Sequence, residues 1–489
     1  MKRAAALFLL ASSLVGAGAA LGGSVGPCQD PWLFPDARVN VVVLPYEPAD
    51  PLRRQLLDAG EQLAYLVKLR ALFSILDYGS VGAVHLKSHD RRPCRIEEVL
   101  GRLVPRLRPG HGLVLVTGRV FEDGGSVFVQ TSLRLLRGGP PETLEVKLPT
   151  GEAVTSARRD REVVFEPAEL AAADLKTLQE RYRTATALRG QPSAEEKPAS
   201  DLPEFHAYSV IGREGEWIRV RLAEGRDGWI QASSGDSLFE RLPELRFLAG
   251  LAGYAVALSY PPASPEARRT AAAADAQLRA FADAPDDSAT TSALAAELRA
   301  RLLLHAGGDG ALGRAQEVLQ DAAKRNPSSA EIRSLAAVLR LKAFAAGDTK
   351  AALQAAASLN AGLTFAPDDR ELQANLLALY KAAQDPGKSR LTPLQAGFPQ
   401  EKLGEQIAAL EASRSENSIL MAQTVFAVKD LLRTQFPKSG IDVSLRAGTL
   451  RISGSVPQRD VAKILKAVKS AQGVRAVRND LTPVMEPPR

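Results

Sequence analysis

Segments in which apolar residues have the spacing of a β-strand alternate along the chain with segments in which they have the spacing of an α-helix. The β-branched run Arg38 to Pro45 is bounded by turn formers and predicts a buried strand. Leucines between Leu52 and Leu69 recur at roughly helical spacing and predict a helix with one face on the sheet. The order β-α-β-α-β-β-β then predicts an open sheet layered by helices. The later elements are expected at Phe73–Leu76, Ile96–Leu107, Gly112–Phe121, Ser126–Leu136 and Thr143–Leu148.

This opening segment, residues 36–150, resembles the α/β domains of the TolB N-terminal and CsgG-like type. The resemblance is carried by an opening strand that ends in Val-Leu-Pro-Tyr at residues 43–46. A later hairpin with Gly118, Arg119 and Val120 completes it. The resemblance implies envelope assembly or partner binding rather than chemistry.

A polar, proline-containing stretch at residues 181–203 predicts a linker. Two β-runs follow, Trp217–Leu222 and Gly228–Ala232, separated by a glycine-containing turn that is typical of a hairpin. Residues 204–236 resemble bacterial Src-homology-3 (SH3)-like domains through their G-x-W-x-x-V-R-L and G-W-I signature.

The SH3-like resemblance implies a small β-barrel with a ligand groove at Trp217 and Trp229, and peptidoglycan as a ligand. A purely structural role for both tryptophans is the alternative. The Arg-Ser-Gly-Pro stretch that usually lines the groove is missing before Tyr208, which puts the cell-wall ligand in doubt.

Residues 247–390 are rich in alanine and leucine and predict an array of helices. The uncharged stretch Phe247–Ser264 opens the array and favours a buried helix over a membrane span. Pro285, Pro327 and Pro367 recur at spacings of 42 and 40 residues, each between two predicted helices. Ser328 with Glu331, and Asp368 with Glu371, have capping-box spacing.

The array resembles tetratricopeptide-type repeats, although its period exceeds the usual ~34 residues. The resemblance implies that protein partners, as extended peptides or helices, bind on a concave face. A helical spacer without a ligand is the alternative.

The tail, residues 414–485, combines strand-like alternation with a helical stripe. It resembles the BON domain of bacterial periplasmic proteins, which implies an α/β sandwich at a phospholipid surface. The expected elements are a helix at Ser418–Phe436, strands at Ile441–Leu445 and Thr449–Val456, a helix at Gln458–Ala471 and a strand at Val474–Leu481. The motif residues are Ile441, Val443, Gly448, Leu450, Ile452, Ser453, Gly454, Val456, Gly473, Val474, Val477, Asn479 and Leu481.

The last predicted helix carries cations on the face opposite its apolar stripe: Arg459, Lys463, Lys466 and Lys469. A basic surface gains up to ~1 kcal/mol per cation near an anionic leaflet, so weak and salt-sensitive binding to anionic phospholipid is expected. A solvated helix face is the alternative. No aromatic residues are interleaved with these charges, which argues against nucleic acid as a partner.

The first residues add a cellular location to this picture. Lys2 and Arg3, an apolar run and the small residues up to Ala19 predict a signal peptide at residues 1–19, with an uncleaved anchor as the alternative. Export to the periplasm or cell envelope favours one disulfide between Cys28 and Cys94 over two free thiols. Two cysteines do not by themselves make a convincing zinc site.

Length and charge agree with several modules. The chain has 489 residues, which suggests three or four domains, and a net charge of +6. Residues 441–489 hold nine Lys or Arg against four Asp or Glu, so +5 of charge lies in the tail.

We found no catalytic constellation. His85, His89 and Asp90 lie near Cys94, but no nucleophile with an orienting partner is legible, and a polar loop is favoured. The expected fold is therefore multidomain α+β: an N-terminal α/β sheet domain, a small SH3-like barrel, an α-helical repeat array and a C-terminal BON α/β sandwich. The expected function is a non-enzymatic, exported scaffold without cofactor or metal. The alternatives are a cell-wall-targeted hydrolase with its site in the N-terminal α/β domain, and an adaptor that works through the array alone.

Overall fold

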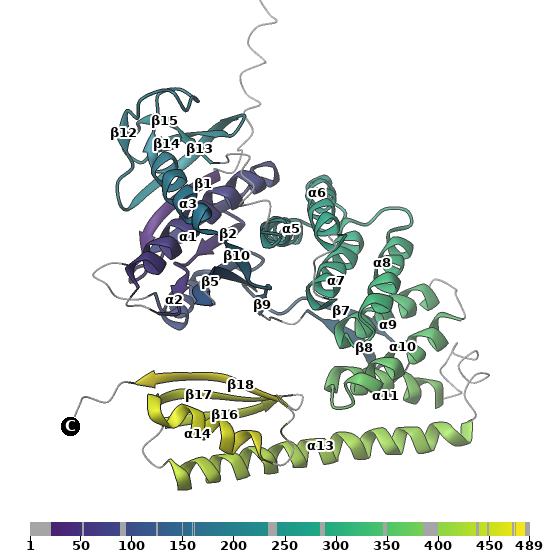
Figure 1. The fold of residues 1–489 in the computed structure, drawn as a ribbon. Helices are drawn as coiled ribbons and strands as arrows, with labels where there is room; N and C mark the ends of the chain where they lie inside the picture. Colours follow the sequence, from purple (N-terminus) through teal and green to yellow (C-terminus); the bar gives the residue numbers. More distant parts are fainter. Residues whose placement is uncertain are drawn as a thin grey trace, which may run out of the picture. The chain divides into compact units, whose positions relative to one another are not determined.

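The computed structural model shows a mixed α+β protein that divides into two compact units (Figure 1). The first unit comprises Met1–Glu142 and Arg158–Arg325, and the second comprises Thr143–Ala157 and Asn326–Arg489. The structure describes residues 21–50, 53–88, 94–123, 126–148, 150–158, 160, 162–232, 242–283, 289–345, 350–384, 400–436, 440–446, 449–471, 474 and 476–484. The predicted signal peptide, residues 1–19, lies outside these ranges.

The first unit is built on an eleven-stranded mixed sheet in the order β10-β6-β5-β2-β4-β1-β13-β14-β15, with β3 beside β5 and β9 beside β6. Strands β1, β4, β2 and β5 run parallel in its centre, and the other main pairings are antiparallel. The strands are β1 (Leu21–Pro27), β2 (Val39–Val43), β3 (Glu47–Pro48), β4 (Val81–Lys87), β5 (Gly112–Asp123), β6 (Ser126–Arg137), β9 (Glu162–Val164), β10 (Ala168–Leu170), β13 (His206–Glu214), β14 (Trp217–Leu222) and β15 (Asp227–Gln231).

Helices cover both faces of this sheet, which explains why β2 is apolar throughout. Val41 and Val43 belong to the core that contains α1 (Arg54–Ile75) and α5 (Glu244–Ala257). The intervening Val42 packs with Leu103 of α2 (Ile96–Leu103) on the other face. The predicted buried strand and the helices on either side of it are therefore confirmed.

A strand predicted for this sheet was wrong, and two of its central strands were not predicted. Phe73–Leu76 is not a strand, because Leu72 and Ile75 continue the buried stripe of α1, which ends only at Ile75. The chain then turns at Gly79, which has a φ of 67°, and enters β4, which we had not predicted. The glycine-rich β1 was missed as well.

The SH3-like segment does not stand apart from this sheet, as a separate barrel would. Strand β13 pairs antiparallel with β1, so β13, β14 and β15 extend the main sheet. The predicted linker, residues 181–203, is folded: it holds the end of α3 (Ala172–Ala185) and the short pair β11 (Ala187–Leu188) and β12 (Ser200–Asp201). Arg189 exchanges two backbone hydrogen bonds with Trp229, at 3.0 and 2.8 Å, which fixes this stretch on β15.

Most of the uncharged stretch lies in α5, and every residue from Phe247 to Ala257 is buried. This confirms the prediction of a buried helix. The first unit ends with α6 (Pro265–Ala282), α7 (Ala289–Ala306) and α8 (Ala311–Arg325). Ser264 caps α6 by accepting a hydrogen bond from the Ala267 amide at 3.2 Å.

The second unit continues the helical pairs between the recurring prolines, with α9 (Ala330–Ala345), α10 (Ala351–Phe365) and α11 (Arg370–Gln384). The cap residues differ from the prediction by one position. Ser329 accepts from the Ile332 amide at 3.3 Å, and Asp369 accepts from the Leu372 amide at 3.0 Å.

A hairpin from the N-terminal part of the chain also belongs to the second unit. It consists of β7 (Thr143–Lys147) and β8 (Ala153–Ala157), which form a separate two-stranded sheet among the described residues. We had placed Thr143–Leu148 in the N-terminal sheet, and this was wrong, because Val154 and Leu148 are buried in the core formed by α9, α10 and α11.

The C-terminal elements follow the predicted order. They are the end of α13 (Gln400–Gln435), β16 (Gly440–Arg446), β17 (Thr449–Pro457), α14 (Gln458–Lys469) and β18 (Ala476–Val484). The strands form one three-stranded sheet in the order β16-β17-β18. Leu450 and Ile452 of β17 share a core with Val428 of α13 and with Ile464 and Val468 of α14, so both helices cover the same face of this sheet.

Candidate binding surfaces

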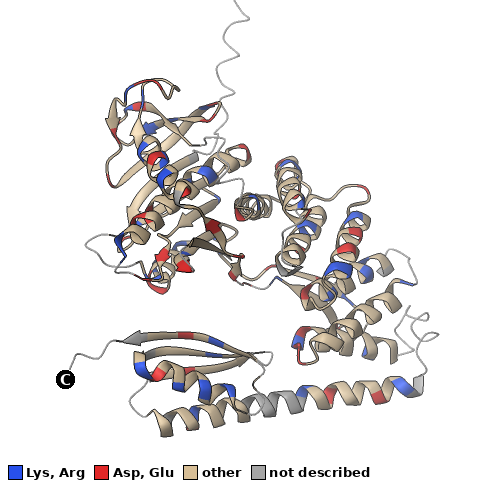
Figure 2. Cartoon of the chain, viewed as in Figure 1, with Lys and Arg blue, Asp and Glu red and all other residues tan. Residues whose placement is uncertain are grey.

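The cations predicted on the last helix lie on the exposed side of α14, while Ile464 and Val468 on its other side are buried. Arg459 and Lys463 each approach Asp460, at 3.9 Å. No ion pair among the described residues involves Lys466 or Lys469, which are both exposed. Basic residues are spread along α14 in Figure 2. The arrangement presents positive charge to any surface that approaches this helix.

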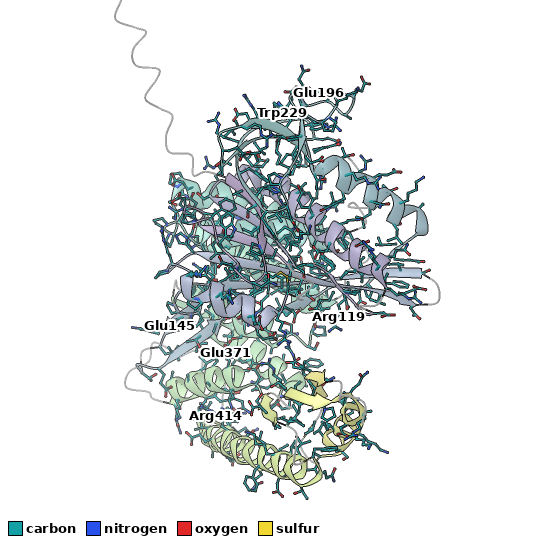
Figure 3. All side chains as sticks on the ribbon, turned by 90° about the vertical axis from the view of Figure 1, so that its left-hand side faces the viewer. Arg119, Glu145, Glu196, Trp229, Glu371 and Arg414 are labelled. Carbon is teal, nitrogen blue, oxygen red and sulfur yellow. A yellow bond between two sulfur atoms is a disulfide. The ribbon has the colours of Figure 1, made fainter. Side chains whose placement is uncertain are left out.

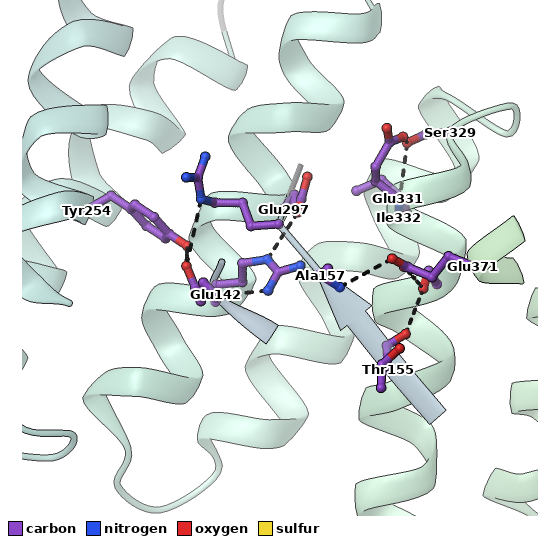
Figure 4. A network of polar contacts seen from close by, with 12 residues as sticks. Glu142, Thr155, Ala157, Tyr254, Glu297, Ser329, Glu331, Ile332 and Glu371 are labelled. Atoms are coloured by element: carbon purple, nitrogen blue, oxygen red, sulfur yellow. Dashed lines mark hydrogen bonds and ion pairs between the residues drawn. The ribbon is translucent and has the colours of Figure 1, made fainter. Parts of the chain in front are cut away.

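The helical array of the second unit holds an extended strand through its main chain. The Thr155 amide donates to Asn375 Oδ1 at 2.9 Å, and Asn375 Nδ2 donates to the Thr155 carbonyl at 2.6 Å. The second amide hydrogen of Asn375 reaches Ser334 Oγ at 3.3 Å, and Ser334 in turn donates to Glu371 at 2.6 Å. Glu371 also accepts from the Ala157 amide at 3.4 Å (Figure 4). We call Ser334, Glu371 and Asn375 the strand clamp.

The side chains of β8 also pack against the helices that hold its main chain. Val154 and Ser156 point to the same side of the strand and are 0 % and 1 % exposed. Asn375 is itself 1 % exposed, so its amide group is enclosed together with the strand. A hairpin of the same chain thus covers α9 and α11.

We expect Asn375→Ala to lower the free energy of unfolding of the second unit by about 2–3 kcal/mol, because the Thr155 amide loses its acceptor and the Thr155 carbonyl loses the nearer of its two donors, with Ser334 Oγ remaining at 3.2 Å. Urea unfolding and the amide hydrogen exchange of Thr155 measure the effect. Asn360→Ala is the control, since the exposed Asn360 makes one side-chain bond to Tyr380 and its loss is expected to cost under about 1 kcal/mol. An unchanged Thr155 exchange rate would mean that the clamp does not hold the strand.

The part of the array in the first unit has an open groove of about 600 Å³ between α6, α7 and α8. Its walls are largely small and apolar, with Ala271, Ala276, Leu302 and Ala306 among them. Asp275 at its edge is already paired with Arg279 and Arg299, each at 2.8 Å. Because the side chains that line the groove are mostly small, an apolar segment could approach the helix backbones closely.

The two tryptophans of the predicted SH3-like groove share one face of β14 and β15, but they differ in burial. Trp217 is 8 % exposed beneath the Arg189 guanidinium, which lies 5.7 Å from its ring centre. Arg189 also donates to the carbonyls of Ala194 and Glu196, so the stretch around Glu196 covers this face (Figure 3). Trp229 is half-buried. The Trp217 ring is therefore covered by Arg189 of the same chain.

His85, the described member of the alternative hydrolase site, lies on β4 and is only 2 % exposed. Both its ring nitrogens lack a hydrogen-bond partner, and Nε2 lies 3.7 Å from Glu61 Oε2. Burial, with Lys68 and other cations nearby, holds the pKa of His85 well below its ordinary value. His89 and Asp90 lie outside the described residues. A neutral, enclosed imidazole is poorly placed to act on an external substrate.

Lys68 of α1 is fully buried in the same region. Its Nζ donates to Tyr208 Oη at 3.2 Å and lies 4.5 Å from the centre of the Tyr65 ring. Burial lowers the pKa of Lys68 to about 7, and burial likewise raises the pKa of Glu61 to about 7. Burial thus penalises the charged form of both groups.

The predicted disulfide between Cys28 and Cys94 is present, with the two Cα atoms 5.4 Å apart. It closes a loop of 66 residues beside β4, where both cysteines pack with Val84 and Leu86. A crosslink over such a loop stabilises a fold by roughly 4 kcal/mol in chain-entropy models.

In the part of the chain that the structure describes, no group of three or more His, Cys, Asp or Glu side chains is arranged to hold a metal ion. None of the described helices is long and apolar enough to cross a membrane. No protein-family model, no curated protein and no solved structure matches the chain.

Proposed function

We propose that this chain is an exported scaffold of the cell envelope. Its C-terminal domain, which resembles the BON domain, would attach it to anionic phospholipid. Its tetratricopeptide-like array would hold extended partner segments, and the SH3-like segment offers a further contact to the cell wall. The signal peptide predicted at residues 1–19 and the Cys28–Cys94 disulfide support export to the periplasm.

The observation that carries the proposal is the polarity of α14. Its apolar side, with Ile464 and Val468, is buried in the domain core. The cations Arg459, Lys463, Lys466 and Lys469 are exposed. Each cation near an anionic leaflet contributes up to ~1 kcal/mol, so four together give weak but measurable attachment. Because the charges lie at the surface, salt should weaken this attachment.

The array supports the second half of the proposal. Asn375, Glu371 and Ser334 all bond to the main chain of β8, the last through its Oγ to the Thr155 carbonyl at 3.2 Å, and main-chain recognition tolerates many sequences. The open groove along α6, α7 and α8 has room for a second apolar segment. Partner proteins are therefore expected to bind as extended or helical segments.

Neutralising the basic side of α14 tests the lipid claim. We expect Lys463→Gln, Lys466→Gln and Lys469→Gln, combined in the full-length chain, to reduce binding to phosphatidylglycerol vesicles on the order of 100-fold at low salt. Vesicle sedimentation measures the bound fraction.

The matched control neutralises three exposed lysines on other helices: Lys176, Lys324 and Lys402. It removes the same net charge and should bind almost as the unchanged chain does. Equal losses in the two triple variants would show that overall charge, and not α14, attracts the protein to lipid.

A further inference from the structure

Phe426 on α13 is 75 % exposed, which makes it the most exposed large apolar side chain among the residues that the structure describes. A helix in a folded domain normally buries such a side chain, because exposing it costs hydrophobic free energy. Its neighbours on the helix do so: Val428 and Leu432 are 0 % and 3 % exposed. The exposure of Phe426 is therefore a local exception on an otherwise normally packed helix.

The direction of Phe426 follows from helix geometry. Thr424, Val428 and Leu432 recur every four residues and form the stripe of α13 that faces the core. Phe426 lies two residues from Thr424 and from Val428, which places it on the opposite side of the helix. It thus points away from the three-stranded sheet.

The cations of α14 point the same way. Ile464 and Val468 face the sheet, and Lys466 lies midway between them in sequence, on the opposite side of the helix. Because α13 and α14 cover the same face of one sheet, Phe426 and the exposed cations lie on the outer side of one helical layer. A bulky apolar side chain and several cations then face a common plane.

We propose that Phe426 inserts into the boundary between headgroups and acyl chains of an anionic leaflet while the cations of α14 contact the headgroups. This inference rests on the proposed lipid attachment and names its apolar component. Interfacial binding of this kind combines buried apolar area with attraction to anionic lipid. Burying one phenylalanine side chain changes a binding equilibrium on the order of 10- to 100-fold, so Phe426 contributes as much as several cations.

Two substitutions in the full-length chain test the insertion. Phe426→Ser is expected to weaken binding to phosphatidylglycerol vesicles by at least about 10-fold. Phe426→Trp is expected to retain binding and to show a blue shift of tryptophan fluorescence on adding the vesicles. Phe365 provides the matched control, since it is 53 % exposed on another helix of the same unit. Phe365→Ser should bind as the unchanged chain does, and Phe365→Trp should show no shift.

The results separate this inference from the proposed function. If the unchanged chain binds but Phe426→Ser binds equally well and Phe426→Trp shows no shift, then insertion is wrong and the electrostatic attachment remains. If the unchanged chain does not bind anionic vesicles at all, both are wrong. Circular dichroism checks that the variants are folded, as expected for changes at an exposed position.

Discussion

Replacing Arg301 with methionine is expected to lower the free energy of unfolding of the first unit by about 3–5 kcal/mol. Arg301 is 1 % exposed, and its guanidinium lies 3.1 Å from Glu297 and 3.7 Å from Glu142. Glu142 also accepts a hydrogen bond from Tyr254 (Figure 4). Methionine preserves much of the volume but removes the cation beside the buried Glu297 and one of the two cations beside Glu142, which keeps Arg158 at 4.0 Å. Removing one partner of a buried ion pair is strongly destabilising, because it leaves an uncompensated charge in the core.

Urea unfolding of the full-length chain measures this loss. Arg134→Met is the control, because Arg134 and Asp160 form a pair with side chains 38 % and 39 % exposed, whose loss should cost under about 1 kcal/mol. The other helices that follow a recurring proline carry leucine at the position of Glu297, namely Leu339 and Leu379. Adding Glu297→Leu to Arg301→Met should therefore recover part of the stability. Equal costs for Arg301→Met and Arg134→Met would refute a buried network.

Replacing Lys68 with methionine should have the opposite effect and stabilise the first unit at pH 7 by about 3–4 kcal/mol. The pKa of Lys68 is about 7 in the folded chain, against an ordinary value of 10.5, because burial penalises the ammonium group. Between pH 7 and 10.5 the unfolded chain therefore binds more protons than the folded chain. Folding stability must rise with pH across this window.

The pH dependence of the stability difference between Lys68→Met and the unchanged chain identifies its cause. The advantage of Lys68→Met should be largest at and below pH 7 and should shrink as pH rises toward 10.5, above which lysine is neutral in both states. Unfolding midpoints at several pH values measure it. Lys176→Met, at an 81 % exposed side chain, should leave the pH profile unchanged. A variant advantage that stays constant between pH 7 and 10 would show that packing, and not the buried charge, is responsible.

The sequence was most informative where one periodicity decided the structure. The tail was predicted element by element, because Ile441, Val443 and Leu445 alternate while Val461, Ile464, Leu465 and Val468 follow helical spacing. Strand β1 was missed because it is rich in glycine and so lacks the β-branched pattern of a strand. Its Gly22 and Gly23 leave room for the rings of Phe34 and Tyr208, and these distant contacts leave no local pattern in the sequence. The hairpin of β7 and β8 looked like more of the N-terminal sheet, since periodicity does not say which partner a strand will find.

The binding surfaces likewise divide into those that local periodicity predicts and those that depend on contacts between distant residues. The four cations of α14 could be assigned to one side from their spacing alone. The strand clamp could not, because Asn375 and Thr155 are 220 residues apart. A polar asparagine within the apolar pattern of residues 370–384 was its only local signal. Phe426 lay inside a predicted helix whose buried side depended on tertiary packing, so its exposure was not predictable.

Attachment to anionic lipid is tested most directly with the unchanged full-length chain and two kinds of vesicle. We expect it to sediment with phosphatidylglycerol vesicles at low salt and not with phosphatidylcholine vesicles. Near 1 M salt, where the Debye length falls to about 3 Å, most of it should be released. Failure to bind either vesicle at low salt, or equal binding to both, would contradict the account.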